Sequence, residues 1–318
     1  MSGNPLISII VPCKDIDDHT RECIKHCKQI DYDGYEIILL PDDSKETVEG
    51  VKVIVTGPVP PGVKRNIGTR NSRGELCAFI DNDAYPRSDW LTRAVKYLED
   101  PQVGGVGGPG LTPEEDNLMQ KASGYVLSSL MVGNLSSRYG TKRSFESDDI
   151  HSCNFIARKL VVEEAGGWNE KYWPGEDTLM CLAIRRLGKK LIEASDVVVY
   201  HHRRPLFKSH LEQVSRFGEH RGFFAKKFPG NSRKTTYVAP SILVLSLLAG
   251  LVLSFLFSFF MYVTVLGVVA YLALSLVAAS LQVRKVKLIL LVWSGTILTH
   301  ITYGVSFLLG LIRRDLKR

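Results

Sequence analysis

The sequence has 318 residues, of which 45% are hydrophobic and 23% are charged, and its formal net charge is +7. These proportions exclude a disordered or a fibrous chain. The charge is unevenly distributed: residues 1–200 carry a balance of −6, residues 201–234 one of +7 and residues 235–318 one of +6. An acidic N-terminal part excludes a uniformly basic nucleic-acid-binding protein, so we expect no nucleic acid among the partners.

The first 100 residues alternate between short apolar runs and longer amphipathic segments. The pattern predicts strands over Leu6–Val11, Glu36–Leu40, Val51–Val55 and Leu76–Ile80, and helices over Asp17–Gln29, Val63–Ser72 and Ser88–Glu99. Strands that alternate with helices indicate an α/β fold with a mostly parallel sheet.

Polar residues follow three of these predicted strands, at Pro12–Asp15, Asp42–Ser44 and Asp81–Asp83. Because ligands of parallel sheets gather at the carboxyl ends of the strands, we expect the three segments to meet at one edge. Asp81 and Asp83 form a carboxylate pair of the kind that binds Mg²⁺ or Mn²⁺. The alternative is that an aspartate here caps the helix that begins near Ser88.

A second acidic pair, Glu176 and Asp177, precedes the predicted helix Thr178–Leu187. Acidic residues at the start of a helix commonly cap it and interact favourably with its dipole. The functional alternative is that one of the two acts as a general base toward an acceptor.

A basic segment, residues 201–237, follows the acidic part of the chain. Basic residues beside a membrane helix commonly contact anionic lipid headgroups. That interpretation explains Gln213, Arg216 and Phe217 less well, because these three lie within five residues and can share one surface.

The C-terminal part is apolar enough to enter a membrane. No charged residue occurs between Thr235 and Val283, and none between Leu288 and Ile312. Since about 20 residues span a bilayer, we expect three membrane helices, at 238–259, 261–281 and 288–312. Three crossings place the basic tail 313–318 opposite the N-terminal part, although basic segments favour the cytoplasmic side.

Small residues form a stripe on the third predicted membrane helix. Gly295, Thr299, Thr302 and Ser306 recur at steps of three and four residues, and Gly304 lies beside them. Such a stripe favours close helix packing; the alternative is a seam for the chain of a lipid acceptor.

Six segments, in this order, carry a resemblance to a known family: ISIIVPCKD at 7–15, EIILLPDDS at 36–44, GVKRNIGTRNSRGELCAFIDNDA at 62–84, NFIARKLVVEEAGGWNE at 154–170, GEDTLMCLAIRRLGKKL at 175–191 and VYHHRRPLFKSHLEQVSRFGEHRG at 199–222. The set resembles membrane-bound family 2 glycosyltransferases, which have the GT-A nucleotide-sugar-binding fold. The last segment is similar to the QxxRW motif of the cellulose-synthase-like branch, with Phe217 in place of Trp and with far fewer membrane helices in the chain.

The resemblance implies roles for individual residues. The residues that it assigns to the nucleotide-sugar donor are Pro12, Asp15, Asp42, Asp43, Arg65, Asn66 and Asp81. Asp81 and Asp83 would bind Mg²⁺ or Mn²⁺, completed by His201 or His202. Asp177, with Glu176 beside it, would provide the general base. Gln213, Arg216 and Phe217 would contact the acceptor and the leaving diphosphate.

Charge distribution and apolar length, together with the resemblance, predict four regions: a cytosolic GT-A catalytic domain (1–200), a basic amphipathic interfacial collar (201–237), a transmembrane domain of about three helices (238–312) and a basic tail (313–318). The expected protein is an integral protein of the cell membrane with a cytoplasmic catalytic domain.

The expected activity is inverting, metal-dependent transfer of a sugar to a hydroxyl of a polyprenyl- or dolichyl-linked glycan. GDP-mannose is the favoured donor, and assembly of glycans for protein glycosylation is the favoured setting. The alternatives are a polyprenyl-phosphate glycosyl synthase, a small polysaccharide synthase, or a non-catalytic membrane protein that binds nucleotide sugars.

Overall fold

The computed structural model describes residues 4–132, 139–140 and 143–316, and the chain forms two compact units. The first unit runs to Pro113 and includes the later stretch that ends at His202. The second comprises the segment from Glu114 through helix α4 (Leu118–Ser128), and the chain from Arg203 onward. Helix α4 packs Ala122 and Val126 into the apolar core of the second unit.

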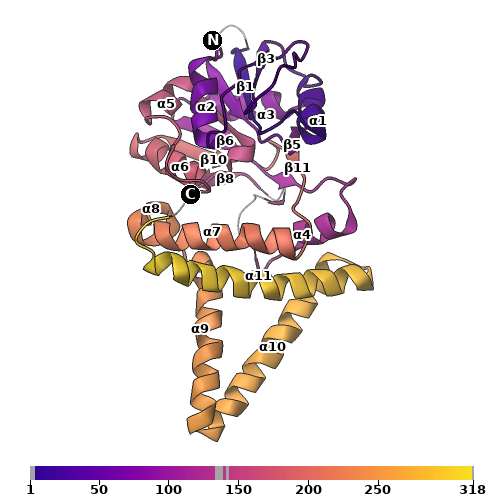
Figure 1. Ribbon diagram of the computed structural model, residues 1–318, viewed down its shortest axis with the longest axis vertical. Helices are drawn as coiled ribbons and strands as arrows, with labels where there is room; N and C mark the ends of the chain where they lie inside the picture. The colour runs from indigo at the N-terminus through magenta and orange to yellow at the C-terminus, as the bar shows by residue number, and fades with distance from the viewer. Residues whose placement is uncertain (1–3, 133–138, 141–142, 317–318) are drawn as a thin grey trace. The chain divides into compact units, whose positions relative to one another are not determined.

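The first unit is built on an eight-stranded sheet with the strand order β3-β2-β1-β4-β9-β6-β10-β8 (Figure 1). Its strands are β1 (Ile7–Pro12), β2 (Tyr35–Leu40), β3 (Lys52–Val53), β4 (Leu76–Phe79), β6 (Val103–Gly107), β8 (Phe145–Ser147), β9 (Phe155–Arg158) and β10 (Lys190–Glu193). β8 and β9 run antiparallel to the strands beside them, and the other pairings are parallel. The predicted α/β class with a mostly parallel sheet is confirmed.

Helices cover both faces of this sheet, because alternate side chains of a buried strand point to opposite faces. The helices are α1 (Asp18–Cys27) and α3 (Trp90–Leu98) on one face, and α2 (Pro61–Arg70), α5 (Lys159–Glu164) and α6 (Glu176–Arg186) on the other. On β1, Ile9 joins the core that contains Cys23 and Leu91, whereas Ile10 joins the core that contains Ile184.

The carboxyl ends of β1, β2 and β4 lie at one edge of the sheet. β1 pairs in parallel with both β2 and β4, and the register sets Pro12 opposite Leu40 and Ile10 opposite Phe79. The three polar segments that follow these strands therefore emerge at the same edge, as the sequence predicts.

A three-stranded sheet brings a distant part of the chain to this edge. Its order is β5 (Ala84–Pro86), β11 (Val199–His201) and β7 (Gly110–Leu111). β11 runs antiparallel to β5, with His201 opposite Ala84. His201 is thereby brought next to Asp83, which precedes β5 in the chain.

The second unit is helical. Besides α4 it contains α7 (Lys208–Lys227), α8 (Pro229–Ser232), α9 (Thr235–Leu256), α10 (Ser258–Gln282) and α11 (Val286–Ile312). α9, α10 and α11 are long and apolar enough to cross a membrane, with mean hydropathies of 2.3, 2.2 and 1.6. The three predicted apolar helices are therefore present, with bounds within a few residues of those expected.

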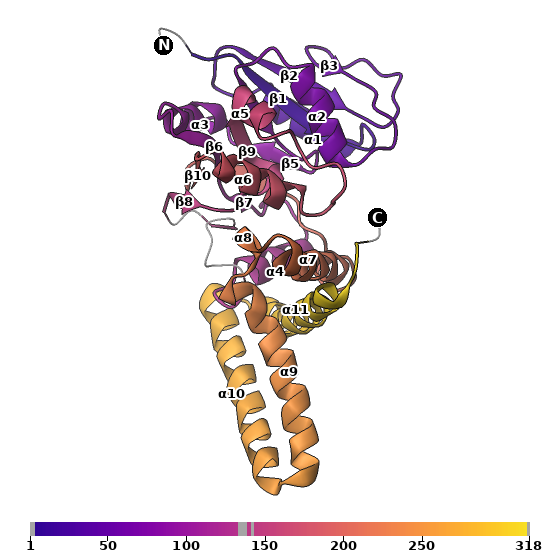
Figure 2. The ribbon, with the colours of Figure 1, turned by 90° about the vertical axis from the view of Figure 1, so that its left-hand side faces the viewer.

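The three apolar helices do not form a parallel bundle. α9 and α10 form a hairpin, whereas α11 lies across the open end of that hairpin and runs alongside α7 (Figures 1 and 2). The small residues of α11 are used in this packing: Thr299 meets His210 of α7, and Ser241 of α9 donates a hydrogen bond to the carbonyl of Gly304. This geometry supports helix packing and not a lipid seam as the role of the stripe.

Gly304 provides a test of this packing. A Cβ at Gly304 would overlap the backbone carbonyl of Pro240, whereas a Cβ at Gly267 of α10 would meet no atom within 4 Å. We expect Gly304→Ala to lower the free energy of unfolding by about 1–3 kcal/mol, the usual cost of overpacking. The matched control Gly267→Ala should leave stability unchanged or raise it, because alanine favours helix. Thermal unfolding of the two variants in detergent measures the difference, and equal unfolding temperatures would contradict the prediction.

Candidate active site

Asp81, Asp83 and His201 form a cluster at the carboxyl edge of the sheet. One ligand atom from each lies within 4.8 Å of the others. Nε2 of His201 is 3.1 Å from Oδ1 of Asp83, and the three side chains remain 19–30% exposed. Two carboxylate oxygens and one imidazole nitrogen are a donor set that suits Mn²⁺ and other divalent cations.

The two adjacent histidines lie in different clusters. Nε2 of His202 is 2.8 Å from Oε2 of Glu22, and its ring lies 4.7 Å from that of His19. Consecutive side chains of an extended chain project to opposite sides, so the two imidazole rings do not both face the carboxylate of Asp83. The structure therefore groups His201, and not His202, with the carboxylate pair.

The protonation of His201 is coupled to Asp83. Burial by itself lowers the pKa of His201, but the adjacent Asp83 carboxylate outweighs it and raises the pKa to about 10. A cation that binds this imidazole therefore competes with a proton for Nε2.

Arg65 of α2 connects Asp81 to Glu176. Its guanidinium is 2% exposed and donates from Nη2 to Asp81 Oδ1 at 2.7 Å and from Nη1 to Glu176 Oε1 at 2.8 Å. The guanidinium also lies over the Trp168 ring, 4.9 Å from its centroid. Because one oxygen of Asp81 is held in this way, the carboxylate is oriented while its second oxygen can still bind a ligand.

The adjacent Lys64 plays a comparable part at the ends of β1 and β2, and it was not among the residues predicted from the sequence. Its buried Nζ donates to the carbonyls of Cys13, at 2.6 Å, and Leu40, at 3.1 Å, and forms an ion pair with Asp42. Two features of the sequence could have pointed to Lys64. It belongs to a pair of basic residues that follows a Pro-Pro-Gly turn, and the predicted strands end near aspartates that a basic side chain could pair with.

Asn66 holds a loop. Its Nδ2 donates to the carbonyl of Trp168 and to Glu170, both at 2.9 Å, and its Oδ1 accepts from the Trp168 amide at 2.8 Å. Arg65 and Asn66 thus have protein partners, and direct contact of either side chain with a nucleotide stays a prediction.

The remaining residues predicted to bind the donor lie at the same edge. Pro12 ends β1 and is buried, Asp42 is half-buried in its pair with Lys64, and Asp15 and Asp43 are exposed. The two exposed carboxylates are the ones that a ligand can approach directly.

Glu176 and Asp177 begin α6 and differ in environment. Glu176 is 4% exposed and faces Arg65; burial raises its pKa to about 7, although Arg65 opposes this shift. Asp177 is half-buried, and its Oδ1 accepts a hydrogen bond from the amide of Thr178 at 2.7 Å. Glu176 therefore serves the ion-pair network, which leaves Asp177 as the more accessible acid.

The predicted acceptor residues belong to the second unit. They are Gln213, Arg216 and Phe217, and all three lie on α7. Arg216 is exposed, and so is Phe217, at 41%. Gln213 and Phe217 are four residues apart and so share one face of the helix.

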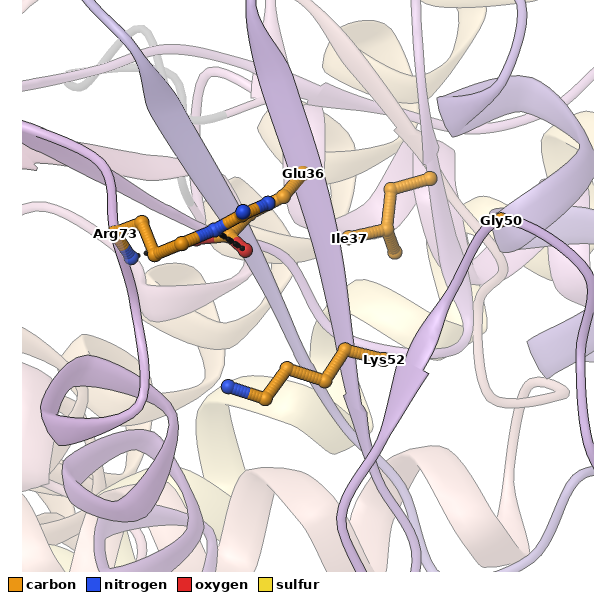
Figure 3. A pocket seen from close by; sticks show the side chains of 5 residues that line it. All are labelled: Glu36, Ile37, Gly50, Lys52 and Arg73. Carbon is orange, nitrogen blue, oxygen red and sulfur yellow. Dashed lines mark hydrogen bonds and ion pairs between the residues drawn. The ribbon is translucent and has the colours of Figure 1, made fainter.

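A hollow of about 360 Å³ lies at the opposite edge of the sheet (Figure 3). Glu36, near the start of β2, and Arg73 form an ion pair in it, with 3.0 Å between Nε and Oε2. Ile37, Gly50 and Lys52 complete its lining. It contains none of the residues of the candidate site.

Residues 8–164 match the model of the family described as Glycosyl transferase family 2. The chain carries a family 2 glycosyltransferase domain. The matched residues include Asp81 and Asp83, whereas Asp177 and His201 follow them in the chain.

Two curated relatives of this chain differ in how much of their length it covers. The O-antigen biosynthesis protein RfbC of Myxococcus xanthus is 27% identical over 225 residues, which are 63% of this chain but 17% of that protein. Glycosyltransferase AglE of Haloferax volcanii is 22% identical over 231 residues, which are 68% of this chain and 72% of that protein.

A solved structure similar to this chain is the mannosyltransferase PcManGT from Pyrobaculum calidifontis in complex with GDP-Man and Mn²⁺. It has a TM-score of 0.66 at 19% identity and covers 96% of this chain and 88% of that one. The likeness confirms the GT-A-like fold together with the apolar C-terminal helices.

The raised pKa of Glu176 predicts a pH dependence of stability. Because the folded state binds this proton more tightly than the unfolded state, stability falls as pH rises from about 4.5 toward about 7. Between these pH values the wild type should lose unfolding free energy relative to Glu176→Gln, whose amide does not titrate.

Denaturant unfolding at a series of pH values measures this difference. Glu163→Gln, at a side chain that is 47% exposed, is the control and should follow the wild type at every pH. A constant difference between wild type and Glu176→Gln would show that the carboxyl does not titrate in this range.

Proposed function

We propose that this chain is an inverting, metal-dependent glycosyltransferase that moves mannose from GDP-mannose to a hydroxyl of a lipid-linked glycan. The observation that carries the proposal is the cluster of Asp81, Asp83 and His201 at the carboxyl edge of a family 2 domain. These residues would hold Mg²⁺ or Mn²⁺, which when bound neutralises the charge that develops on the leaving diphosphate.

The donor is proposed to lie along the ends of β1, β2 and β4. Asp15 and Asp43 are exposed there and can accept hydrogen bonds from a ribose or a base. Lys64 and Arg65 hold the backbone and the carboxylates of this edge in place. The proposal of GDP-mannose is supported by the likeness to a mannosyltransferase solved with GDP-Man and Mn²⁺.

Asp177 is the proposed general base. A sugar hydroxyl has a high pKa and needs a base as it attacks, whereas a polyprenyl phosphate is already ionised. Asp177 is half-buried at the start of α6, less buried than Glu176, whose link to Arg65 and Asp81 ties the helix to the cation cluster. An accessible acid at this position supports a hydroxyl acceptor.

A lipid-linked acceptor is proposed because the catalytic domain is followed by helices able to cross a membrane. Gln213, Arg216 and Phe217 on α7 are the proposed contacts for the acceptor and the diphosphate. The proposed location is the cell membrane, with the catalytic domain in the cytoplasm.

Removal of Asp83 tests the cation site. We expect Asp83→Ala to abolish transfer and to remove the Mn²⁺ dependence of nucleotide binding, because the cluster loses one of two carboxylates. His201→Gln should weaken Mn²⁺ binding, by about 10-fold or more. His202→Gln, one residue further along the chain, is the matched control and should bind Mn²⁺ as the wild type does. Titration calorimetry with Mn²⁺ and GDP measures these affinities, and equal weakening by both histidine variants would contradict the assignment.

Replacement of Asp177 tests the base. Asp177→Asn should lower the rate of transfer by about 10²–10⁴ while donor affinity stays nearly unchanged, because the proton acceptor is lost but the donor site is intact. Transfer from GDP-mannose to a lipid-linked oligosaccharide, followed under single-turnover conditions, gives the rate. A normal rate in this variant would reduce Asp177 to a helix cap.

A further inference from the structure

The packing of α11 against α7 bears on how the chain enters the membrane. Contacts follow in the same order along the two helices: Thr299 with His210, Ser306 with Ser215, and the carbonyl of Leu311 with Lys226. Arg313, just after α11, forms an ion pair with Glu219. The approach is close, since a Cβ on Gly222 would overlap the backbone of Phe307. α7 and α11 are therefore parallel neighbours over most of the length of α7.

α7 is too highly charged to enter the hydrocarbon of a bilayer. Its charged residues are Lys208, Glu212, Arg216, Glu219, Arg221, Lys226 and Lys227. Charged side chains are costly within a membrane and occur there mostly in paired or functional positions. If α11 crossed the bilayer with its present packing, it would carry α7 into the hydrocarbon beside it.

The α9–α10 hairpin has the opposite character. It contains no charged residue, and most of its side chains face outward, such as Leu248 at 56% and Leu266 at 71% exposure. With 22 and 25 residues, its helices are long enough to cross a hydrocarbon core of about 30 Å. Figures 1 and 2 show it projecting away from the α7–α11 pair.

Exposed apolar side chains form a stripe along one side of α11. They are Leu290, Leu298, Ile301, Val305, Leu309 and Ile312, spaced mainly by three and four residues; Val286, Lys287 and Leu311 are exposed as well. The exposed side chains of α7 are mainly charged. The pair thus presents apolar and charged surfaces side by side, which is the character of helices that lie in a membrane interface.

Basic residues lie directly before two of the helices of the second unit. Arg233 and Lys234 precede α9, and Arg284 and Lys285 precede α11. Where α7, α9 and α11 meet, a hollow of about 440 Å³ is lined by basic and apolar side chains, among them Lys226, Arg233, Lys234, Val238, Phe307 and Leu311. Such a combination suits the depth of lipid headgroups.

We propose that the α9–α10 hairpin alone crosses the bilayer and that α11 lies in the plane of the membrane interface beside α7. The basic segments before α9, before α11 and after Ile312 then all lie on one side of the membrane, together with the N-terminal domain. This arrangement satisfies the preference of basic segments for the cytoplasmic side, which three crossings would violate at the C-terminal tail.

Cysteine labelling of the full chain tests this topology. The six native cysteines are buried, so the unsubstituted protein provides a low background for a membrane-impermeant maleimide. The probe sites are Ser258→Cys at the tip of the hairpin, Asp315→Cys after α11 and Lys227→Cys as the reference for the cytoplasmic side; all three positions are exposed.

In intact cells we expect Ser258→Cys to react and Asp315→Cys to react only after the cells are disrupted, like Lys227→Cys. Reaction of Asp315→Cys in intact cells would establish a third crossing and overturn the proposal. Protection of Ser258→Cys until disruption would also overturn it, because the hairpin would then not cross.

The depth of α11 in the membrane can be measured independently of the labelling experiment. A fluorophore is placed on Leu290→Cys, Leu298→Cys or Leu309→Cys of the protein in vesicles whose lipids carry a quencher at a known depth. Because 19 residues of helix rise about 28 Å, a crossing helix would place these sites at very different depths. The in-plane arrangement predicts equal, shallow depths, and Leu298→Cys much deeper than the other two would contradict it. Leu248→Cys in the hairpin serves as the deep reference.

Discussion

The candidate site depends on one buried cation, the guanidinium of Arg65. An arginine does not lose its proton in a protein, so a buried arginine requires anionic partners. Asp81, at the end of β4, and Glu176, at the start of α6, provide them on the two arms of the guanidinium. Three elements that are distant in the sequence are thereby fixed together, and the first carboxylate of the cation cluster is oriented by the same ion pair.

Lys64 extends this arrangement to the first two strands. It lies one residue before Arg65 on α2 and bonds the carbonyls that follow β1 and end β2. One turn of a helix therefore holds the carboxyl ends of three parallel strands with two buried positive charges. Their protein partners keep both charges compensated, and the exposed Asp15 and Asp43 remain at the rim for a ligand. At the carboxyl edge of the sheet, buried cationic side chains therefore hold the strand ends in place, and carboxylates are exposed to solvent.

In the second unit the governing constraint is the charge of α7. Judged by length and hydropathy alone, α11 would be a third membrane-spanning helix, because it has 27 residues and a mean hydropathy of 1.6. Its packing along a helix with seven charged residues argues for a different position. An apolar composition allows a helix to enter the hydrocarbon of a bilayer. Whether it does so depends also on the helices that pack against it. The buried contacts of Thr299 and Ser306 with α7 are the interactions that make this choice.

The sequence by itself determined the features that follow from local patterns. Apolar runs ending in polar residues located β1, β2 and β4 and the edge at which Asp15, Asp43 and Asp81 emerge, because parallel strands share their carboxyl edge. Tertiary structure decided what depends on distant partners. The pairing of β11 with β5 brought the ring of His201, and not that of His202, to the carboxylate of Asp83, since strand register selects which side chain faces which neighbour. One of the two partners of Arg65, Glu176, lies 111 residues away, and α4 joined the helical unit through an apolar core that local periodicity does not specify. Local sequence encodes elements and their ends, but contacts between elements depend on packing across the whole chain.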